Sequence, residues 1–204
     1  MKTRKLNAKT IAFIGMLGAL AAVLMFVNVP IPFVPPFYRL DVSELPALFA
    51  GFFLGPVAGI IVTAIKIVIY TLVAGTSTGY VGEAMNFAGA AVFVVVAVLI
   101  YRAHRTKKGA IVALTVSSVV CSIVWIFYNA YIAFPLYTKV MGIPMDALVQ
   151  MGTAVNPLIK SELTFMLFGV FPFNLIKHGV TSVITFLVYK KASNVLRGIL
   201  GIED

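Results

Sequence analysis

Residues 43–73 read SELPALFAGFFLGPVAGIIVTAIKIVIYTLV, and this stretch decides the fold class. Glu44 and Lys66 are its only charged residues. A run this apolar is typical of a segment that lies in lipid. The Gly55-Pro56 pair interrupts the run, because proline lacks an N–H and clashes with the preceding helical turn. We therefore expect two consecutive helices in a bilayer.

The first of these helices, residues 43–54, is short for a membrane crossing. With Ser43 as its N-cap, Pro46 falls in the first turn, where the missing N–H matters least. Its 12 residues would span about 18 Å, against a hydrocarbon core of about 30 Å. It is therefore expected to be a tilted helix packed inside protein or a partial span. Residues 56–73 would form a complete span.

The composition of the whole chain agrees with a membrane protein. Hydrophobic residues make up 61% of the 204 positions and charged residues 11%, with a mean hydropathy of +1.03. Soluble domains carry about 25% charged residues. At about 20 residues a span, the chain has room for roughly six spans. We predict an all-α membrane protein with six transmembrane helices, forming one integral-membrane domain over residues 1–204.

The remaining helices are placed by apolar runs and by proline and glycine breakers. Four prolines between residues 30 and 36 predict an extended loop, and GTSTG at 75–79 predicts another. Pro135 is expected to end the fifth spanning helix. The predicted helices are 8–28, 43–54, 56–73, 82–101, 109–134, a short helix 158–168 and the last span 172–191.

The net charge of +9 arises from basic residues at the ends of apolar segments and not from a face suited to nucleic acid. With six spans, both termini and the loop at 102–108 share one side. That side carries 11 of the 16 basic residues, namely Lys2, Arg4, Lys5, Lys9, Arg102, Arg105, Lys107, Lys108, Lys190, Lys191 and Arg197. Lys and Arg concentrate in cytoplasmic loops. We expect a multi-pass membrane protein with both termini in the cytoplasm.

No enzyme or metal signature is found in the sequence. His104 and His178 lack metal-ligand spacing, and there is no nucleophile–base pattern. The phosphate-binding motif G-x-x-x-x-G-K-[ST] is missing, so any ATP hydrolysis would need another subunit. Cys121 is the only cysteine, which rules out an intramolecular disulfide. We expect no catalytic residue, cofactor or metal.

Polar residues inside the apolar helices indicate a binding site near the outer side. An ionisable residue within the membrane, such as Lys177, costs about 2.5–3.5 kcal/mol and suggests a function, although snorkelling is the alternative. Glu83 suits a helix N-terminus, yet Asn86 lies on the same face one turn later. For Lys66, the sequence is equally compatible with structural pairing to a carbonyl and with a functional role.

Further polar and aromatic residues extend this set. Asp41 and Ser43 suit a helix cap or a ligand contact, and the two roles are compatible. Trp125 and Tyr128 fit an aromatic belt at the membrane surface, but Asn129 needs a hydrogen-bond partner. Together with Asn174, Lys177, Glu83 and Asn86, these groups offer donors and acceptors among apolar neighbours. Such a mixture suits a polyhydroxylated, partly aromatic ligand.

The first helix carries a stripe of small residues. Ala8, Ala12, Gly15, Ala19 and Ala22 recur at spacings of four and three. Small residues allow helices to approach closely in lipid. Packing within the same bundle and docking of a partner are equally compatible with this pattern.

Three blocks of the chain resemble a known family. RLDVSELPALFAGFFLGPVAGIIVTAIK (39–66), GTSTGYVGEAMNF (75–87) and PFNLIKHGVTSVITFLVYKK (172–191) resemble the riboflavin-specific substrate-binding (S) components of energy-coupling factor (ECF) transporters. The resemblance covers nearly the whole chain. It implies a six-helix membrane fold that captures the vitamin outside the cell. It also implies as partners a transmembrane coupling (T) subunit and two ATPase subunits.

The resemblance carries over residue by residue. The family pattern L-D-x-S-[DE]-x-P matches here at Leu40, Asp41, Ser43, Glu44 and Pro46, G-E-x-x-N at Gly82, Glu83 and Asn86, and P-F-N-L-I-K at Asn174 and Lys177. Asn129 fits a polar position without a tight motif. The A-x-x-x-A coupling motif is matched by Ala8 and Ala12, and Gly15 and Ala19 extend its face. His178 stands where glycine is more frequent in the family.

The resemblance implies riboflavin as a transported ligand held by named groups. Leu40, Val42, Leu45, Trp125 and Tyr128 are expected to enclose the ring, and Glu83, Asn129, Asn174 and Lys177 to bind its polar edges. An S component for another vitamin is the nearest alternative. A self-sufficient carrier would show paired broken helices and coupling-ion ligands, which are not found.

Overall fold

The computed structural model describes residues 7–200, with side chains described through residue 189. Lys2, Arg4 and Lys5, used above for orientation, lie outside the described residues. The helices are α1 (Ala8–Phe26), α2 (Leu45–Leu54), α3 (Pro56–Ala74), α4 (Val81–Ala103), α5 (Lys107–Tyr128), α6 (Phe134–Met141), α7 (Met145–Val155), α8 (Glu162–Phe165) and α9 (Phe171–Leu200). Two π-helical segments, η1 (Asn129–Ala133) and η2 (Met166–Val170), join α5 to α6 and α8 to α9.

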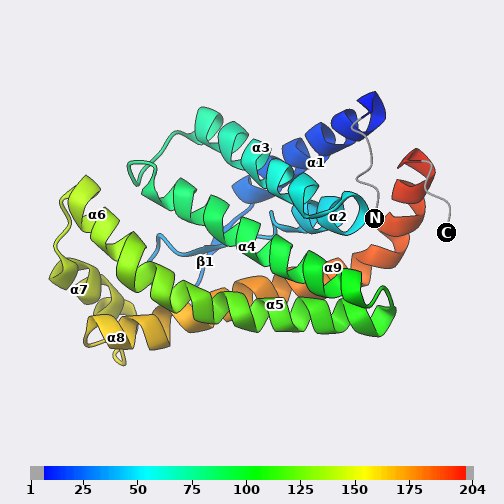
Figure 1. The fold of residues 1–204 in the computed structure, drawn as a ribbon. Helices are drawn as coiled ribbons and strands as arrows, with labels where there is room; N and C mark the ends of the chain where they lie inside the picture. Colours follow the sequence, from blue (N-terminus) through cyan, green and yellow to red (C-terminus); the bar gives the residue numbers. More distant parts are fainter. Residues whose placement is uncertain (1–6, 201–204) are drawn as a thin grey trace.

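Within the described residues, five helical segments are long and apolar enough to cross a membrane: Ala8–Phe26, Pro56–Ala74, Val81–Ala103, Lys107–Met141 and Glu162–Tyr189. Large apolar side chains such as Leu72 and Leu187 are mostly exposed on their outer surfaces, as expected for contact with lipid. In Figure 1, the start of α1, the end of α9 and the α4–α5 turn lie at one end of the bundle. The fold is that of an all-α membrane protein.

The short helix α2 is packed inside the protein. It begins at Leu45, two residues after the expected N-cap, and residues 46–51 along it are buried. Gly55 separates α2 from α3 with a φ of 112°, a conformation that favours glycine. Pro56 then opens α3, where its missing N–H is tolerated. Of the two expectations for this segment, burial favours the protein-packed helix.

Two predicted helix boundaries are wrong, and the same local structure explains both. Pro135 does not end a helix, because the chain continues from α5 through η1 and α6 to Met141. The Phe134 N–H donates to the Asn129 carbonyl, five residues back, and this wider turn makes room for the proline ring. In η2, the Phe171 N–H likewise donates to the Met166 carbonyl just before Pro172.

The predicted short helix 158–168 therefore does not stand apart from the last span. The helix begins at Glu162 and runs without interruption into α9. A separate helix, α7, occupies residues 145–155, where no helix was predicted. Its N-cap position is Pro144, and Asp146 stands in its first turn, where a negative charge complements the helix dipole.

The proline-rich loop is folded back as a small hairpin. Its strands β1 (Val29–Pro30) and β2 (Arg39–Leu40) pair antiparallel, with Val29 opposite Leu40. Inside the loop, Ile31 and Val34 are buried in a small cluster with Phe173 of α9. This packing holds the loop against the last helix and delivers residues 37–44 to the middle of the bundle.

Candidate functional site

The described residues enclose one large open cavity between the proline-rich loop and helices α4, α5 and α9. Its volume is about 680 Å³ when the open solvent at its mouth is included. The lining residues are Phe37, Tyr38, Arg39, Glu44, Gly82, Met85, Asn86, Gly89, Ala90, Trp125, Asn129, Tyr137, Phe173, Asn174, Lys177 and His178. The wall thus combines aromatic rings, three asparagine amides and charged groups.

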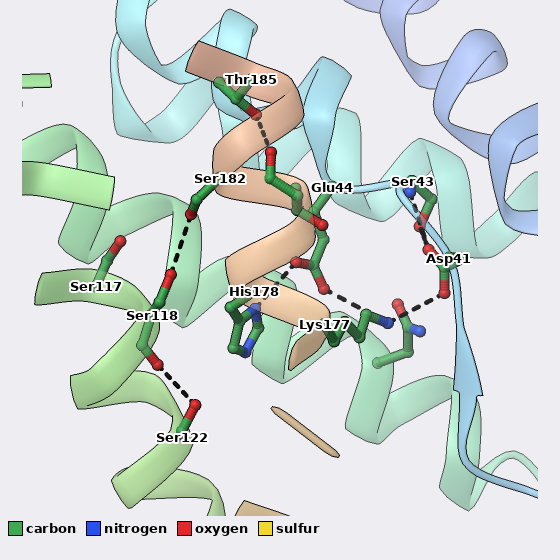
Figure 2. Close-up of polar contacts among 12 residues, drawn as sticks. Asp41, Ser43, Glu44, Ser117, Ser118, Ser122, Lys177, His178, Ser182 and Thr185 are labelled. Carbon is green, nitrogen blue, oxygen red and sulfur yellow. Dashed lines mark hydrogen bonds and ion pairs between the residues drawn. The ribbon is translucent and has the colours of Figure 1, made fainter. Parts of the chain in front are cut away.

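A buried cluster of charges forms one side of the cavity. Lys177 Nζ lies 3.1 Å from Asp41 Oδ2 and 3.6 Å from Glu44 Oε1. Figure 2 shows the lysine ammonium between the two carboxylates. The other Glu44 oxygen, Oε2, lies 3.2 Å from His178 Nδ1. Removing a charge from water is costly unless it is paired and hydrogen-bonded, so these contacts explain how Lys177 is tolerated inside the bundle.

Asp41 organises the loop that leads into α2. Its Oδ1 accepts a hydrogen bond of 2.9 Å from the Ser43 backbone N–H and another from the Ser43 hydroxyl. Burial raises the pKa of the Asp41 carboxyl, but Lys177 and Lys66 together outweigh it, and the pKa lies below its usual range. Asp41 is therefore a carboxylate that orders the loop and holds the Lys177 ammonium.

Lys66 lies behind the cavity wall, fully buried in α3. Its Nζ donates to Ser43 Oγ over 3.0 Å and to Asn86 Oδ1 over 2.8 Å. A carbonyl partner for Lys66 was as compatible with the sequence as a functional role. The described partners are two side chains that the sequence placed in the site, and one of them, Asn86, pairs through its amide carbonyl oxygen.

The three asparagines are held by different partners. Asn129 Oδ1 accepts from the Tyr38 hydroxyl at 3.0 Å, while Asn129 Nδ2 donates to the Trp125 carbonyl at 2.9 Å. Asn174 Nδ2 donates to the Val170 carbonyl at 2.8 Å. Asn129 opens η1, and Val170 ends η2. The two π-helical turns therefore lie beside the amides of the site, a frequent place for such turns.

Of the predicted ligand residues, some line the cavity and others lie behind it. Those in the wall are Glu44, Asn86, Trp125, Asn129, Asn174 and Lys177. Behind it, Asp41 and Ser43 hold the two buried lysines. Tyr128 packs edge-on against Trp125, with ring centroids 4.7 Å apart.

The remaining predicted residues have other neighbours. Glu83 Oε2 accepts hydrogen bonds from the Thr76 and Thr78 hydroxyls, at 3.0 and 2.9 Å, and so ties the 75–79 loop to the start of α4. Leu40 packs on the Ile31–Val34–Phe173 cluster. Leu45 packs against the core between α1 and α4. Val42 is half-buried, and its carbonyl accepts from the Leu45 N–H.

Several lining residues were not predicted from the sequence. Phe37, Tyr38 and Tyr137 come from segments whose position depends on how the proline-rich loop and α6 fold. Two others had a usable signal. Phe173 lies one helical turn before Lys177, and His178 lies one helical turn after Asn174, so both could be expected next to a predicted site residue.

The small-residue stripe lies on the outer surface of α1. Ala8, Ala12 and Ala19 are exposed, and a Cβ added at Gly15 would meet no atom within 4 Å. Gly18, in contrast, faces the bundle, where an added Cβ would lie 2.4 Å from Ile65. Ala22, the last residue of the stripe, is buried. Packing within the described bundle therefore accounts for Ala22 but not for the four residues before it.

Comparison with known proteins gives a consistent result. The family model described as "ECF transporter, substrate-specific component" matches residues 9–189. The riboflavin transporter RibU of Staphylococcus aureus (strain TCH60) is 36% identical over 199 residues, covering 96% of this chain and 98% of the relative. The riboflavin transporter FmnP of Bacillus subtilis (strain 168) is 30% identical over 187 residues, covering 91% and 93%.

A solved structure agrees with the sequence comparisons. The S component of a bacterial ECF transporter superposes with a TM-score of 0.71 at 35% identity, covering 93% of this chain and 98% of that one. The family model, the relatives and this fold all extend over nearly the whole chain. The chain therefore belongs to the substrate-specific components of ECF transporters.

Proposed function

We propose that this chain is the riboflavin-binding S subunit of an ATP-driven ECF importer and captures the vitamin on the outer side of the bacterial plasma membrane. The observation that carries this proposal is the open cavity, whose wall combines aromatic rings, asparagine amides and a paired ammonium group. The family match and two relatives named as riboflavin transporters support the same ligand. The chain is a multi-pass membrane transport protein and not an enzyme.

The wall suits the chemistry of riboflavin. The vitamin has a flat ring system, apolar at one end and amide-like at the other, and a ribityl chain with several hydroxyls. Aromatic side chains such as Tyr38, Trp125 and Phe173 are suited to contact the ring faces. Asn129 and Asn174 supply donors and acceptors. An unpaired polar group in a buried site costs about 1–3 kcal/mol, so ligands lacking matching groups are disfavoured.

The predicted residues that do not line the cavity hold or pack against residues that do. Asp41, Ser43 and Glu83 hold lysines or loops next to the cavity. Tyr128 packs on Trp125. Leu40, Val42 and Leu45 belong to the segment that joins the hairpin to α2 and shape the wall through packing.

We further propose that the chain crosses the membrane six times, with both termini in the cytoplasm, as one domain over residues 1–204. Five long apolar helices and the shorter α2 support six passes. The excess of basic residues near the termini and in the 102–108 loop supports a cytoplasmic position for that side. The cavity mouth would then face outward.

The exposed face of α1 is the proposed docking surface for the T subunit, which acts with two ATPase subunits. Ala8, Ala12, Gly15 and Ala19 leave this face with little side-chain bulk. Association in lipid depends on close packing, which small residues allow. The sequence holds no phosphate-binding loop, in keeping with ATP hydrolysis by another subunit.

The test is a titration of the purified full-length chain with riboflavin, followed by quenching of flavin fluorescence. We expect saturation at one riboflavin per chain and no competition from a large excess of thiamine or biotin. Absence of quenching together with saturable binding of another vitamin would replace this proposal with an S component for that vitamin. Flavin uptake that proceeds without an ATPase module would instead indicate a self-sufficient carrier.

A further inference from the structure

Lys66 and Asn86 form a hydrogen bond in which only Lys66 can be the donor. Lys66 lies on α3, is 1% exposed and does not line the cavity. Its Nζ lies 2.8 Å from Asn86 Oδ1. A lysine ammonium carries three donors and no acceptor. Only the carbonyl oxygen of the Asn86 amide can therefore face Lys66.

This hydrogen bond determines where the Asn86 Nδ2 group points. Asn86 lines the cavity, and the described residues offer no acceptor to its Nδ2. With Oδ1 held by Lys66, the amide is prevented from turning over. Position 86 then presents its amide donors to the cavity. Asn174 differs, because its Oδ1 has no donor among the described residues and only one of its two Nδ2 hydrogens is used, by the Val170 carbonyl. It can therefore accept as well as donate.

We propose that Lys66 is a positioning residue that makes Asn86 a dedicated hydrogen-bond donor to the bound ligand. The ligand must then present an acceptor at the α4 wall, such as a carbonyl, a ring nitrogen or a hydroxyl oxygen. This inference rests on the proposed function, since riboflavin carries acceptors of all three kinds. Lys66 acts on specificity without touching the vitamin.

A purely structural role is the competing explanation. Lys66 also donates to Ser43 Oγ at 3.0 Å, so it joins α3 to the start of α2 as well as to α4. Loss of such a buried contact lowers stability whatever the ligand does. The experiment therefore needs variants that separate the donor at position 86 from the contact with Lys66.

The first variant is Asn86→Asp in the full-length chain. A carboxylate keeps an acceptor for Lys66 and so preserves the α3–α4 contact, but it removes the amide donor. We expect riboflavin affinity to fall about 10- to 100-fold, as for Asn86→Ala, while the melting temperature stays at or above that of Asn86→Ala. Wild-type affinity for Asn86→Asp would overturn the donor assignment.

The second step is a double-mutant cycle with Lys66→Met. If Lys66 acts through Asn86, Lys66→Met weakens riboflavin binding in the wild-type chain but adds less than about 3-fold to the loss in Asn86→Ala. Equal losses in both backgrounds would show that Lys66 is a structural clamp. Should Lys66→Met fail to fold, Asn86→Asp still decides the donor assignment.

Two controls complete the design. Thr63→Val removes a different buried hydroxyl from α3, one that donates to the Gly59 carbonyl, and should leave riboflavin affinity unchanged. The wild-type titration in the same series separates the two proposals. If the wild type does not bind riboflavin, the proposed function fails; if it binds and the variants bind equally well, the positioning role alone fails.

Discussion

Lys177 Nζ lies 3.1 Å from Asp41 Oδ2, so a buried ion pair ties the last helix to the loop after β2. The two side chains are 8% and 5% exposed. Because Lys177 also lines the cavity, the pair joins the ligand wall to the segment that carries Tyr38 and Arg39. We therefore expect this one contact to affect both stability and binding, and the two effects can be separated by mutation.

Replacing Lys177 with methionine should damage both properties. The change leaves the carboxylates of Asp41 and Glu44 buried without the ammonium, and breaking such a pair typically costs about 3–5 kcal/mol. We also expect riboflavin affinity to fall by about 1.5–3 kcal/mol, the range for hydrogen bonds to charged groups. Thermal unfolding in detergent and fluorescence quenching measure the two effects.

The matched variant adds Asp41→Asn to Lys177→Met. Removing one carboxylate reduces the uncompensated charge, so part of the lost stability should return. Affinity should stay low, because the cavity still lacks its ammonium group. Recovery of both properties would mean that Lys177 serves only to neutralise the carboxylates. Wild-type affinity in the single variant would place Lys177 outside the binding site.

Glu83 is expected to act through the loop that it holds. Its Oε2 accepts from the hydroxyls of Thr76 and Thr78, so Glu83→Ala should loosen the 75–79 loop and lower affinity less than Lys177→Met does. Thr78→Val removes one of the same hydrogen bonds and should produce a similar, smaller change in the titration. A large loss for Glu83→Ala beside no change for Thr78→Val would indicate direct contact between Glu83 and the ligand.

Gly89 leaves room for the indole of the cavity wall. A Cβ added at Gly89 would lie 2.0 Å from Trp125 Cζ2, so Gly89→Ala must displace the ring at a cost of about 1–3 kcal/mol. Riboflavin affinity should fall. Trp125 is the chain's single tryptophan, so intrinsic fluorescence reports its displacement directly.

The control for Gly89→Ala is Gly179→Ala on α9. An added Cβ there meets no atom within 4 Å, and alanine is the better helix former. Its indole emission and riboflavin affinity should match those of the wild type. Equal affinity for both variants would show that the position of the Trp125 ring does not matter for binding.

The sequence predicts the long helices well because their signal is local. Apolar runs such as 56–73 and the break at Gly55-Pro56 need no tertiary information. The ends at Pro135 and Pro172 were predicted wrongly for a physical reason. A proline interrupts a regular α-helix, but a π-helical turn ahead of it relieves the conflict. Apolar runs and helix breakers do not predict such a turn.

The residues of the candidate site likewise fall into those with a local sequence signal and those without one. Lys177 and Asn174 stand out in the sequence because burying polar groups in an apolar helix is costly and calls for partners. Tyr38 carries no such signal, since its place in the wall depends on the hairpin and on its hydrogen bond to Asn129. The role proposed for Lys66 likewise could not be predicted from the sequence, because it depends on the contact between Lys66 of α3 and Asn86 of α4.

The last prediction concerns the stripe on α1, where Ala12→Phe should block assembly with the T subunit and vitamin uptake. Ala12 is exposed, whereas Gly18 faces Ile65 inside the bundle, so phenylalanine at position 12 does not disturb the described core. It does prevent the close helix approach that small residues allow in lipid. Co-purification with the coupling module and flavin uptake by cells are the measurements, with riboflavin titration of the isolated chain expected to match the wild type.

The control for Ala12→Phe is Leu20→Phe, an exposed α1 position about a third of a turn away from the stripe at about 100° per residue. It adds similar bulk to the lipid-facing surface, and assembly and uptake should be preserved. If Ala12→Phe unfolds the chain or abolishes riboflavin binding, the stripe contributes to the bundle itself. If both variants assemble and transport normally, the T subunit docks elsewhere, and the exposure of Ala8, Ala12 and Ala19 reflects contact with lipid alone.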